Sequence, residues 1–488
     1  MHISKLESLK RREFLRRTAA LGMAGSASSL ALSLAGIGEA AAQSAQDYKA
    51  LVCVFLYGGN DHDNTFVPFD NTSHTVYQTL RDVGGDASTK IYIPKSELTG
   101  LSTIGLPSGR QYAVQRAMSS LAGLYEAKNM GILLNVGPLV KPTSKAEYTN
   151  AKSGDLPPKL FSHNDQFSLW QSGLIEGAEG ATSGWGGRLG DMFLGSDKKA
   201  HFTCINVAGN AVFMSGQNFL PYQVTSKGPV AISSINYSSG VYGNAACKAA
   251  LNTLLSKSPS HWMEKEWARM VKSSIDNRQS VTTGLDLSSA AGFFITPFGT
   301  ENLPAQLQLV ARMIHGRANL DVTRQVFFVS LGGFDHHDNL KAAHAGTDGN
   351  SGLLKKLNDA MYSFYKATEQ LGVANQVTTF TASDFGRTLS SNGDGSDHGW
   401  GSHHMVMGGA VDGGKFWGKA PDLSNTANAL NGPDTIGQGR LLPSTSVDEF
   451  AAALARWMDV DEDQLPTVLP NYKAFQVPGR TLPKIFGV

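Results

Sequence analysis

The stretch QVFFVSLGGFDHHDN, residues 325–339, decides the fold that we expect for this chain. Its first half is dominated by β-branched and aromatic residues, a pattern typical of a strand buried on both faces. Two glycines follow, and then come Asp335, His336, His337 and Asp338. Such an ending indicates a functional site at the edge of a sheet, because open α/β sheets bind ligands at the carboxyl ends of their strands.

The segments that follow predict that this strand belongs to a parallel sheet. Residues 351–372 have an amphipathic helical pattern, and residues 375–387, NQVTTFTASDFGR, form a second apolar strand. Strand, helix and strand in this order make a crossover unit with two parallel strands. Further elements are expected as strands at 48–61 and 130–137, helices at 112–129, 303–316 and 447–460 (the last with a capping box of Ser446 and Glu449), and an insertion or cap at 190–300.

The composition is that of an ordinary globular protein. The 488 residues are 41 % hydrophobic and 17 % charged, with a formal net charge of +1, enough for one large core or two domains. No basic excess is present to neutralise phosphates, which argues against a nucleic-acid partner. Three cysteines exclude a disulfide framework. No stretch after the N-terminal segment approaches the ~18 consecutive apolar residues of a membrane span, so we expect no span in the mature protein.

Residues 1–42 are expected to be an export signal rather than part of the fold. A basic start with Arg11 and Arg12 leads into a mildly apolar Ala, Gly, Ser and Leu stretch that ends in the small residues Ala40 to Ala42. The paired arginines resemble a twin-arginine signal. This predicts the twin-arginine translocon as a partner and a periplasmic or other extracytoplasmic location. An amphipathic N-terminal helix or an uncleaved anchor is the alternative.

Three of the expected strands end in the same way. FLYGGND, FVSLGGFD and FTASDFGR lead from apolar residues through small ones to Asp61, Asp335 and Asp384. The carboxyl ends of parallel strands share one edge of a sheet, so we expect the three carboxylates to converge. Unneutralised carboxylates this close repel each other, and a bound divalent cation would remove the conflict. The alternative is that each aspartate is a turn or helix-capping residue.

Histidines gather at the same places. Seven of the chain's thirteen histidines lie beside the three aspartates or in two nearby motif loops. A mixed Asp/His shell suits Zn, Mn or Fe, an oxygen-dominated one would admit Mg or Ca, and either could hold one or two ions. Paired histidines are also common in exposed loops. The candidate metal ligands are Asp61, Asp335, His336, His337, Asp384, His398 and His403.

Six motifs carry a resemblance to a known family. They are LVCVFLYGGNDHDNTFVP, LFSHNDQ, GWGGRLGD, SLGGFDHHDN, TASDFGRTLSSNGDGSDHGWGSHHMVMGGAV and GRLLPSTSVDEFAAALARW. From residue 48 to its C-terminus the sequence resembles an exported family, domain of unknown function number 1501, which is grouped with the alkaline phosphatase superfamily. The resemblance implies that residues 43–488 form an α/β domain, a three-layer α/β/α sandwich with a mostly parallel, alkaline-phosphatase-like sheet and an inserted cap segment.

The resemblance also implies which residues bind metal. The positions that match the superfamily are Asp61 after the first strand, Asp335 with His336 or His337, Asp384, and His398 or His403 late in the chain. Phe385 departs from the pattern, because it stands where a histidine is usual after the third aspartate. This departure leaves open whether the site binds one ion or two.

A nucleophile is expected from the same resemblance. The superfamily places a Ser, Thr or Cys at a helix N-terminus, where backbone N–H groups favour an anionic intermediate. Ser162 lies at such a helix start beside His163, with Thr143 as the rival, although Ser162 and Asp165 are also a plausible capping pair. Arg387 is a candidate for bidentate binding of an anionic ester, or for a structural pair. Ser162, His163 and Arg387 are thus the candidate catalytic residues.

These observations predict an exported, metal-dependent hydrolase or transferase that acts on phosphate or sulfate esters of a small molecule or a polysaccharide. A formylglycine sulfatase is disfavoured, because no cysteine has the Cys-x-Pro/Ala-x-Arg setting that this modification requires. The alternative is a non-catalytic, metal-containing periplasmic or surface protein that acts in binding or assembly.

Overall fold

The computed structural model describes residues 48–85, 89–175, 180–194, 199–218, 220–230, 244–256, 261–346 and 351–487. The expected export signal, residues 1–42, lies outside the described residues. The chain divides into two units, Met1–Tyr48 and Lys49–Val488, and the helices and strands described below belong to the second. None of the described helices is both long and apolar enough to cross a membrane.

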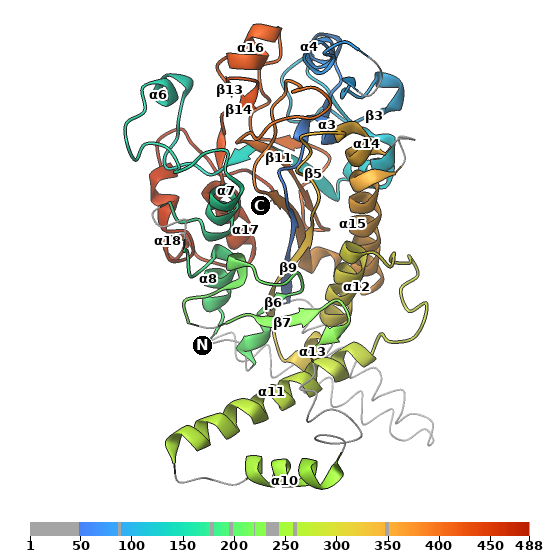
Figure 1. Ribbon diagram of the computed structural model, residues 1–488, viewed down its shortest axis with the longest axis vertical. Coiled ribbons are helices and arrows are strands. Elements are labelled where there is room, and N and C mark those ends of the chain that lie inside the picture. The colour runs from blue at the N-terminus through green and yellow to red at the C-terminus, as the bar shows by residue number, and fades with distance from the viewer. Residues whose placement is uncertain are drawn as a thin grey trace, which may run out of the picture. The chain divides into compact units, whose positions relative to one another are not determined.

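Three parallel strands form the centre of the main sheet, as the sequence predicts. β1 (Lys49–Leu56) lies between β9 (Arg324–Leu331) and β10 (Val377–Ser383) and pairs with both in parallel register (Figure 1). Almost all residues of the three strands are buried, which explains their continuous apolar sequences. Their carboxyl ends therefore share one edge of the sheet.

The sheet extends on both sides of this centre. The further strands are β5 (Met130–Gly137), β6 (Cys204–Asn206), β7 (Tyr222–Thr225), β8 (Gly228–Pro229), β11 (Ser402–Met407), β12 (Phe416–Trp417) and β15 (Thr445–Ser446). β11 runs antiparallel between β10 and β5, while β12 and β15 pair in parallel with β5. On the other side β6 and β7 continue parallel to β9, and β8 is antiparallel to β7. The sheet is mixed but mostly parallel.

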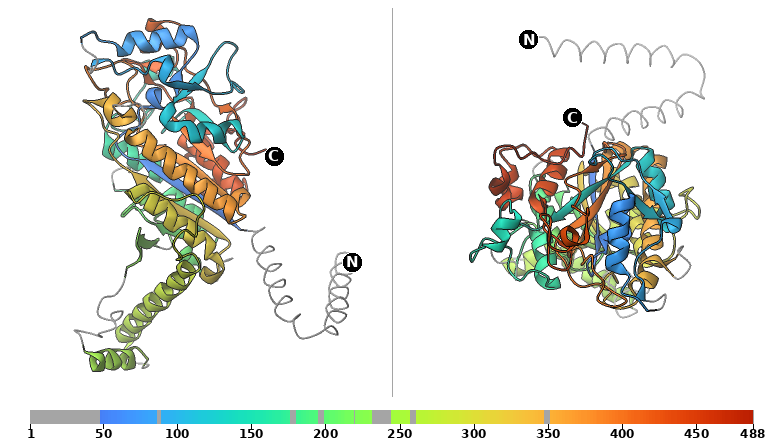
Figure 2. Two further views of the ribbon diagram at one scale, coloured as in Figure 1. Left: turned by 90° about the vertical axis from the view of Figure 1, so that its right-hand side faces the viewer. Right: turned by 90° about the horizontal axis from the view of Figure 1, so that it is seen from above.

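Helices cover both faces of the sheet and complete a three-layer α/β/α sandwich, as expected. On one face lie α5 (Ser119–Glu126), α12 (Asn302–His315) and α15 (Gly352–Gln370); on the other lie α7 (His163–Ser172), α8 (Trp185–Asp191), α17 (Val447–Trp457) and α18 (Leu465–Val468) (Figures 1 and 2). The alternation of side chains along β1 sends Leu51, Cys53 and Phe55 into one core with Trp170 of α7 and Phe450 of α17.

One helix prediction is confirmed at its cap and another is wrong at its start. α17 begins at a capping box in which the Ser446 side chain accepts from the backbone N–H of Glu449, and the Glu449 carboxylate accepts from that of Ser446. The helix expected over 112–129 begins only at α5, because Tyr112–Gln115 form the strand β4. β4 pairs with two short strands, β2 (Val67–Pro68) and β3 (Leu98–Gly100), in a second sheet. This strand pairing outweighs the helical spacing of the segment.

The segment 190–300, expected to be an insertion or cap, contains two kinds of structure. Its strands β6, β7 and β8 extend the main sheet. Its helices α10 (Ala245–Ser256) and α11 (Trp262–Asp286) form a pair that projects beyond the edge of the sandwich (Figures 1 and 2). The C-terminal end of α11 is anchored beside α12 and α13 (Arg317–Leu320).

Candidate metal centre

Four ionisable side chains meet at the carboxyl edge of the central strands. Asp335, in the loop after β9, has one carboxylate oxygen 3.3 Å from Nε2 of His163 and the other 3.3 Å from Nε2 of His398. The Nε2 atoms of these two histidines are 3.1 Å apart. His337 adds a third imidazole, whose Nε2 lies 2.9 Å from that of His398 and 3.2 Å from Asp335. We call His163, Asp335, His337 and His398 the Asp335 cluster.

The spacing within the cluster fits the ligand shell of a metal ion. Atoms bound at ~2.0–2.2 Å in a tetrahedral shell stand about 3.3–3.6 Å from one another. The ligand atoms of His163, Asp335 and His398 all lie within 4.8 Å of one another. The side chains of these three residues are 29 %, 43 % and 24 % exposed, so the centre is open to a ligand from solvent.

The hydrogen bonds of His398 decide which of its ring nitrogens is free. Nδ1 lies 2.7 Å from the carbonyl oxygen of Phe161, so Nδ1 carries the hydrogen and donates it. Burial lowers the pKa of His398, which favours the neutral ring. Its Nε2 then carries a lone pair, which faces a carboxylate oxygen of Asp335 at 3.3 Å and the Nε2 atoms of His163 and His337 at 3.1 and 2.9 Å. Two acceptors at this distance repel each other, and a cation between them would turn the repulsion into coordination.

Carboxylates stand behind the other two imidazoles. Nδ1 of His163 lies 2.7 Å from Oδ2 of Asp384, which also accepts from the backbone N–H of Gly58. The hydrogen bond to Asp384 raises the pKa of His163. Nδ1 of His337 lies 3.6 Å from the carboxylate of Asp397. An acceptor behind each ring is the usual support of histidine ligands in metal sites. Asp384 therefore acts on the cluster through His163.

Unusual backbone brings the segments of the cluster together. His163 is the first residue of α7, and the preceding Lys159 and Phe161 have φ angles of 46° and 73°, in the left-handed region that bulky residues rarely adopt. At the end of β1, Gly58 has a φ of 113°, and a Cβ there would stand 2.4 Å from the backbone nitrogen of Asp335. Glycine is therefore required for the close approach of these two loops.

Phe385 forms an apolar wall of the cluster. Its ring centroid lies 4.7 Å from those of both His163 and His398, and its side chain is fully buried. Gly59 provides the space, because a Cβ at that position would stand 2.4 Å from the Phe385 ring. The residue that departs from the superfamily pattern thus fixes the orientation of two imidazoles by packing, and offers no ligand atom.

Three of the predicted metal ligands lie outside the Asp335 cluster. Asp61 is buried and accepts hydrogen bonds from both terminal nitrogens of Arg81, at 2.6 and 2.8 Å. Although burial opposes its charge, Arg81 holds the pKa of Asp61 below its usual value. Nε2 of His336 is buried without a hydrogen-bond partner among the described residues. His403 accepts from the backbone N–H of Asn135 through Nδ1. The structure brings together four of the seven predicted metal residues, namely Asp335, His337, His398 and, through His163, Asp384.

Arg387 is an internal partner of the cluster. Its side chain is fully buried and donates from Nη1 to Asp335 at 2.8 Å and to the carbonyl of Gly58 at 3.1 Å. The Nε group donates to Ser396 at 3.0 Å. Although burial opposes the charge of Asp335, the hydrogen bond from Arg387 holds the pKa of this carboxyl below its usual value. Arg387 is therefore occupied by protein groups rather than directed at a ligand.

The two candidate nucleophiles have different surroundings. Ser162 is the N-cap residue of α7, but its hydroxyl caps no backbone N–H and donates instead to Asp165 at 2.6 Å. It immediately precedes His163 and thus adjoins the Asp335 cluster. The Thr143 hydroxyl donates to the carbonyl of Lys141, within its own loop. Ser162 is therefore the candidate that adjoins the cluster along the chain, whereas the hydroxyl of Thr143 is bonded within its own loop.

Sequence reasoning assigned His163 to catalysis and missed its place among the ligand atoms. It noted Asp397 beside His398 in the same loop but gave it no role, and it missed Phe161 and Arg440, which support His398. Phe161 acts through its backbone carbonyl, for which side-chain patterns carry no signal. Arg440 lies inside one of the six motifs and could have been singled out there.

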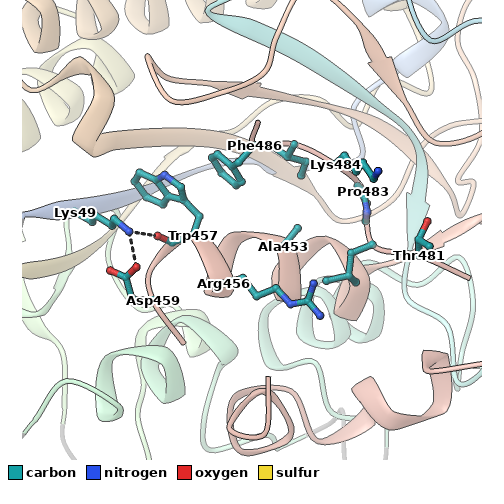
Figure 3. Close-up of a pocket in the computed structure, with 11 residues that line it drawn as sticks. Lys49, Ala453, Arg456, Trp457, Asp459, Thr481, Pro483, Lys484 and Phe486 are labelled. Atoms are coloured by element: carbon teal, nitrogen blue, oxygen red, sulfur yellow. Dashed lines mark hydrogen bonds and ion pairs between the residues drawn. The ribbon is translucent and has the colours of Figure 1, made fainter. Parts of the chain in front are cut away.

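A cavity lies at the opposite end of β1, at the first residue of the strand. Its volume is about 510 Å³, and it is lined by Lys49, Ala453, Arg456, Trp457, Asp459, Thr481, Leu482, Pro483, Lys484, Ile485 and Phe486 (Figure 3). Lys49, the first residue of β1, donates to the carbonyl of Trp457 and to Asp459, both at 2.7 Å. None of the predicted site residues lines this cavity, so we do not assign the candidate centre to it.

Comparisons with known proteins place the chain in a family. Residues 48–469 match the family described as "Protein of unknown function (DUF1501)". No curated protein matches the chain. Among solved structures it is similar to Ps i-CgsB in complex with k-i-k-neocarrahexaose, with a TM-score of 0.36 and 9 % identity over 88 % of this chain and 77 % of that one. It is also similar to the C-terminal periplasmic domain of EcEptC from Escherichia coli, with a TM-score of 0.31 and 11 % identity over 89 % and 88 %. Likenesses this distant carry no argument about function.

Proposed function

The chain belongs to the DUF1501 family, and from this premise we propose that it is a metal-dependent hydrolase or transferase that acts on phosphate or sulfate esters. The observation that carries the proposal is the unprotonated Nε2 of His398, which faces the carboxylate of Asp335 at 3.3 Å. Two further imidazoles approach the same point. The proposal keeps the grouping with the alkaline phosphatase superfamily that the sequence motifs suggest.

The donor set favours one ion of borderline softness. His163, Asp335 and His398 would hold it, with His337 as a fourth ligand. A shell of three nitrogens and one oxygen suits Zn, Mn or Fe better than Mg or Ca, which prefer oxygen. A second ion has less support, because Arg81 already neutralises Asp61. When bound, the ion would polarise the ester and stabilise the charge that develops on its oxygens.

The start of α7 supplies the groups that would bind and attack the ester. The hydroxyl hydrogen of Ser162 points to Asp165, so the lone pairs of Oγ face away from that carboxylate. Because the Ser162 side chain caps no backbone N–H, the first N–H groups of α7 remain available to an anion. Ser162 is the proposed nucleophile: its hydroxyl proton passes to Asp165, and its oxygen forms a bond to phosphorus or sulfur as the bond to the ester oxygen breaks.

The proposed location follows from the N-terminal segment. We propose that residues 1–42 are a twin-arginine signal, read by the translocon and removed on export, and that the domain acts in the periplasm or outside the cell. Fusion of residues 1–42 to a reporter tests this: export that stops when Arg11 and Arg12 are both replaced by lysine supports it, and export that continues contradicts it.

A panel of esters tests the activity. Metal-replete protein is assayed against phosphate monoesters, phosphate diesters and sulfate esters, together with His398→Ala. His261→Ala, at the exposed N-cap histidine of α11, is the matched control. Turnover of at least one class, retained by the control and lost in His398→Ala, is expected. Absence of turnover of every class by the metal-replete wild type would contradict the proposal.

The alternative is a non-catalytic binding or assembly protein, and one observation favours it. The pKa of His163 is raised by Asp384, and a charged His163 could donate its Nε2 hydrogen to His398 at 3.1 Å. With Arg387 on Asp335, the charges would then balance without an ion. Metal that is retained while no ester is turned over would favour this function.

A further inference from the structure

We propose that Arg440 is a positioning residue of the Asp335 cluster: it locks the loop that carries His398 to the strained segment that carries His163. The inference rests on the proposed function, because it assumes that the cluster binds a metal ion. Arg440 belongs to the motif GRLLPSTS and has no part in the proposed chemistry.

Three contacts link Arg440, His398 and Phe161 to one another. Nε of Arg440 donates to the backbone carbonyl of His398 at 2.7 Å. Its guanidinium carbon lies 4.8 Å from the centroid of the Phe161 ring, a stacked cation–π contact. The third contact is the hydrogen bond from Nδ1 of His398 to the carbonyl of Phe161, at 2.7 Å. One arginine thus holds both the backbone of His398 and the residue that orients its ring.

The contact with Phe161 acts on a backbone that needs support. Phe161 has a φ of 73°, and a bulky residue stays in this region only when its surroundings hold it there. Phe161 directly precedes Ser162 and His163, so any relaxation of its backbone would rotate the start of α7. The Nε2 of His163 would then move away from that of His398.

The backbone fixes Arg440 opposite His398. Arg440 opens the short strand β14 (Arg440–Leu441), and the carbonyl of Leu441 accepts from the backbone N–H of Gly401 at 3.0 Å. This bond holds β14 beside the loop of His398. A second bond, from Nη1 of Arg440 to the carbonyl of Gly437 at 3.4 Å, further restrains the guanidinium. The guanidinium of Arg440 therefore binds backbone carbonyls of the protein and is not directed at a ligand.

Removal of the lock should weaken metal binding without removing a ligand. Loss of a supporting partner in a metal site typically costs about 10–100-fold in affinity. We therefore expect Arg440→Ala to bind metal 10–100-fold more weakly than the wild type. Arg440→Lys keeps a donor for the His398 carbonyl but loses the planar stack, and should fall between the two.

The test is a titration of the metal-free, full-length protein with Co²⁺, which reports its coordination through visible absorption. Wild type, Arg440→Ala, Arg440→Lys, Phe161→Ala and the double variant Arg440→Ala/Phe161→Ala are compared. Arg269→Ala, at an exposed arginine of α11, is the matched control. Because Arg440 and Phe161 act as one unit, the two substitutions should not add. The double variant should bind Co²⁺ no more weakly than the single variant with the lower Co²⁺ affinity. Thermal unfolding without metal identifies any variant that fails to fold.

The outcomes separate this inference from the proposed function. Weakened Co²⁺ binding with an altered absorption band in Arg440→Ala, partly restored in Arg440→Lys, supports the lock. Wild-type affinity and an unchanged band in a folded Arg440→Ala would overturn it while leaving the metal centre intact, and an effect confined to the KM for an ester would do the same. Failure of the wild type to bind any Co²⁺ would overturn the metal centre itself, and the lock with it.

Discussion

His163 and His398 stand 235 positions apart in the chain, yet their Nε2 atoms are 3.1 Å from each other. Nδ1 of His163 is bonded to Asp384 and Nδ1 of His398 to the carbonyl of Phe161. Both rings are thus turned by their outer partners so that their remaining nitrogens face a common point. Phe385 packs against both and keeps them there. The arrangement is what a ligand shell requires, and it yields the following predictions.

Asp384→Asn should weaken metal binding, and Asp335→Asn should abolish it. Asp384 supports His163 from behind, so its loss should cost about 10–100-fold in affinity, whereas Asp335 supplies a ligand oxygen. Competition titration against a chromophoric chelator measures both. If the two substitutions weaken metal binding equally, Asp384 is a ligand itself and does not act only through His163.

Asp61→Asn should destabilise the fold and leave the metal affinity unchanged. The substitution removes the carboxylate that both terminal nitrogens of the buried Arg81 bind and leaves only Asp63, at 3.6 Å, as a charged partner, which costs up to about 5 kcal/mol in the free energy of unfolding. Urea unfolding measures the loss. Asp82→Asn, which removes a partly exposed pair with Lys90, is the control and should cost less than about 1 kcal/mol. A large loss of metal by folded Asp61→Asn would restore Asp61 as a ligand.

The sequence predicts the central strands of the fold better than it predicts the contacts of the side chains at their ends. β1, β9 and β10 are predictable because strands buried on both faces are apolar throughout, and parallel pairing then puts Asp61, Asp335 and Asp384 at one edge. The sequence cannot tell that Asp61 meets Arg81, because that bond depends on where α4 (Asn71–Arg81) packs.

The same limit applies within the candidate centre. His163 follows Ser162 in a motif that suggests a nucleophile, and only the left-handed backbone at Phe161 turns its ring toward His398. Backbone carbonyls, glycine contacts such as that of Gly58 and packing by Phe385 leave no charge or period in a sequence. These contacts nevertheless decide which side chains of the centre could bind an ion and which ones only orient them.

Ser162→Ala should abolish ester turnover and keep the metal, whereas Thr143→Ala should remain active. Ser162 adjoins the cluster at the start of α7, and the hydroxyl of Thr143 is bonded within its own loop. Turnover and metal content are measured on the same preparations. Full activity of Ser162→Ala would remove this residue as the nucleophile and point to direct attack by water.

Asp448→Asn should change the dependence of stability on pH. Burial raises the pKa of Asp448 to about 7. The folded state therefore binds this proton more tightly than the unfolded state, and the wild type loses stability as pH rises from about 4 to 7. Asparagine has no proton to lose, so the variant should gain on the wild type over this range, by up to about 4 kcal/mol at pH 8. Denaturant unfolding at pH 4 and pH 8 measures the difference, and a constant difference would contradict the prediction.

Elemental analysis of the purified, folded protein tests the central claim most directly. Wild type and His398→Ala are loaded with Zn²⁺ or Mn²⁺, freed of excess metal and analysed beside the His261→Ala control. We expect one tightly held ion per chain in the wild type and the control, and none in His398→Ala. A wild type that holds no ion, or a His398→Ala variant that holds as much as the wild type, would contradict this claim.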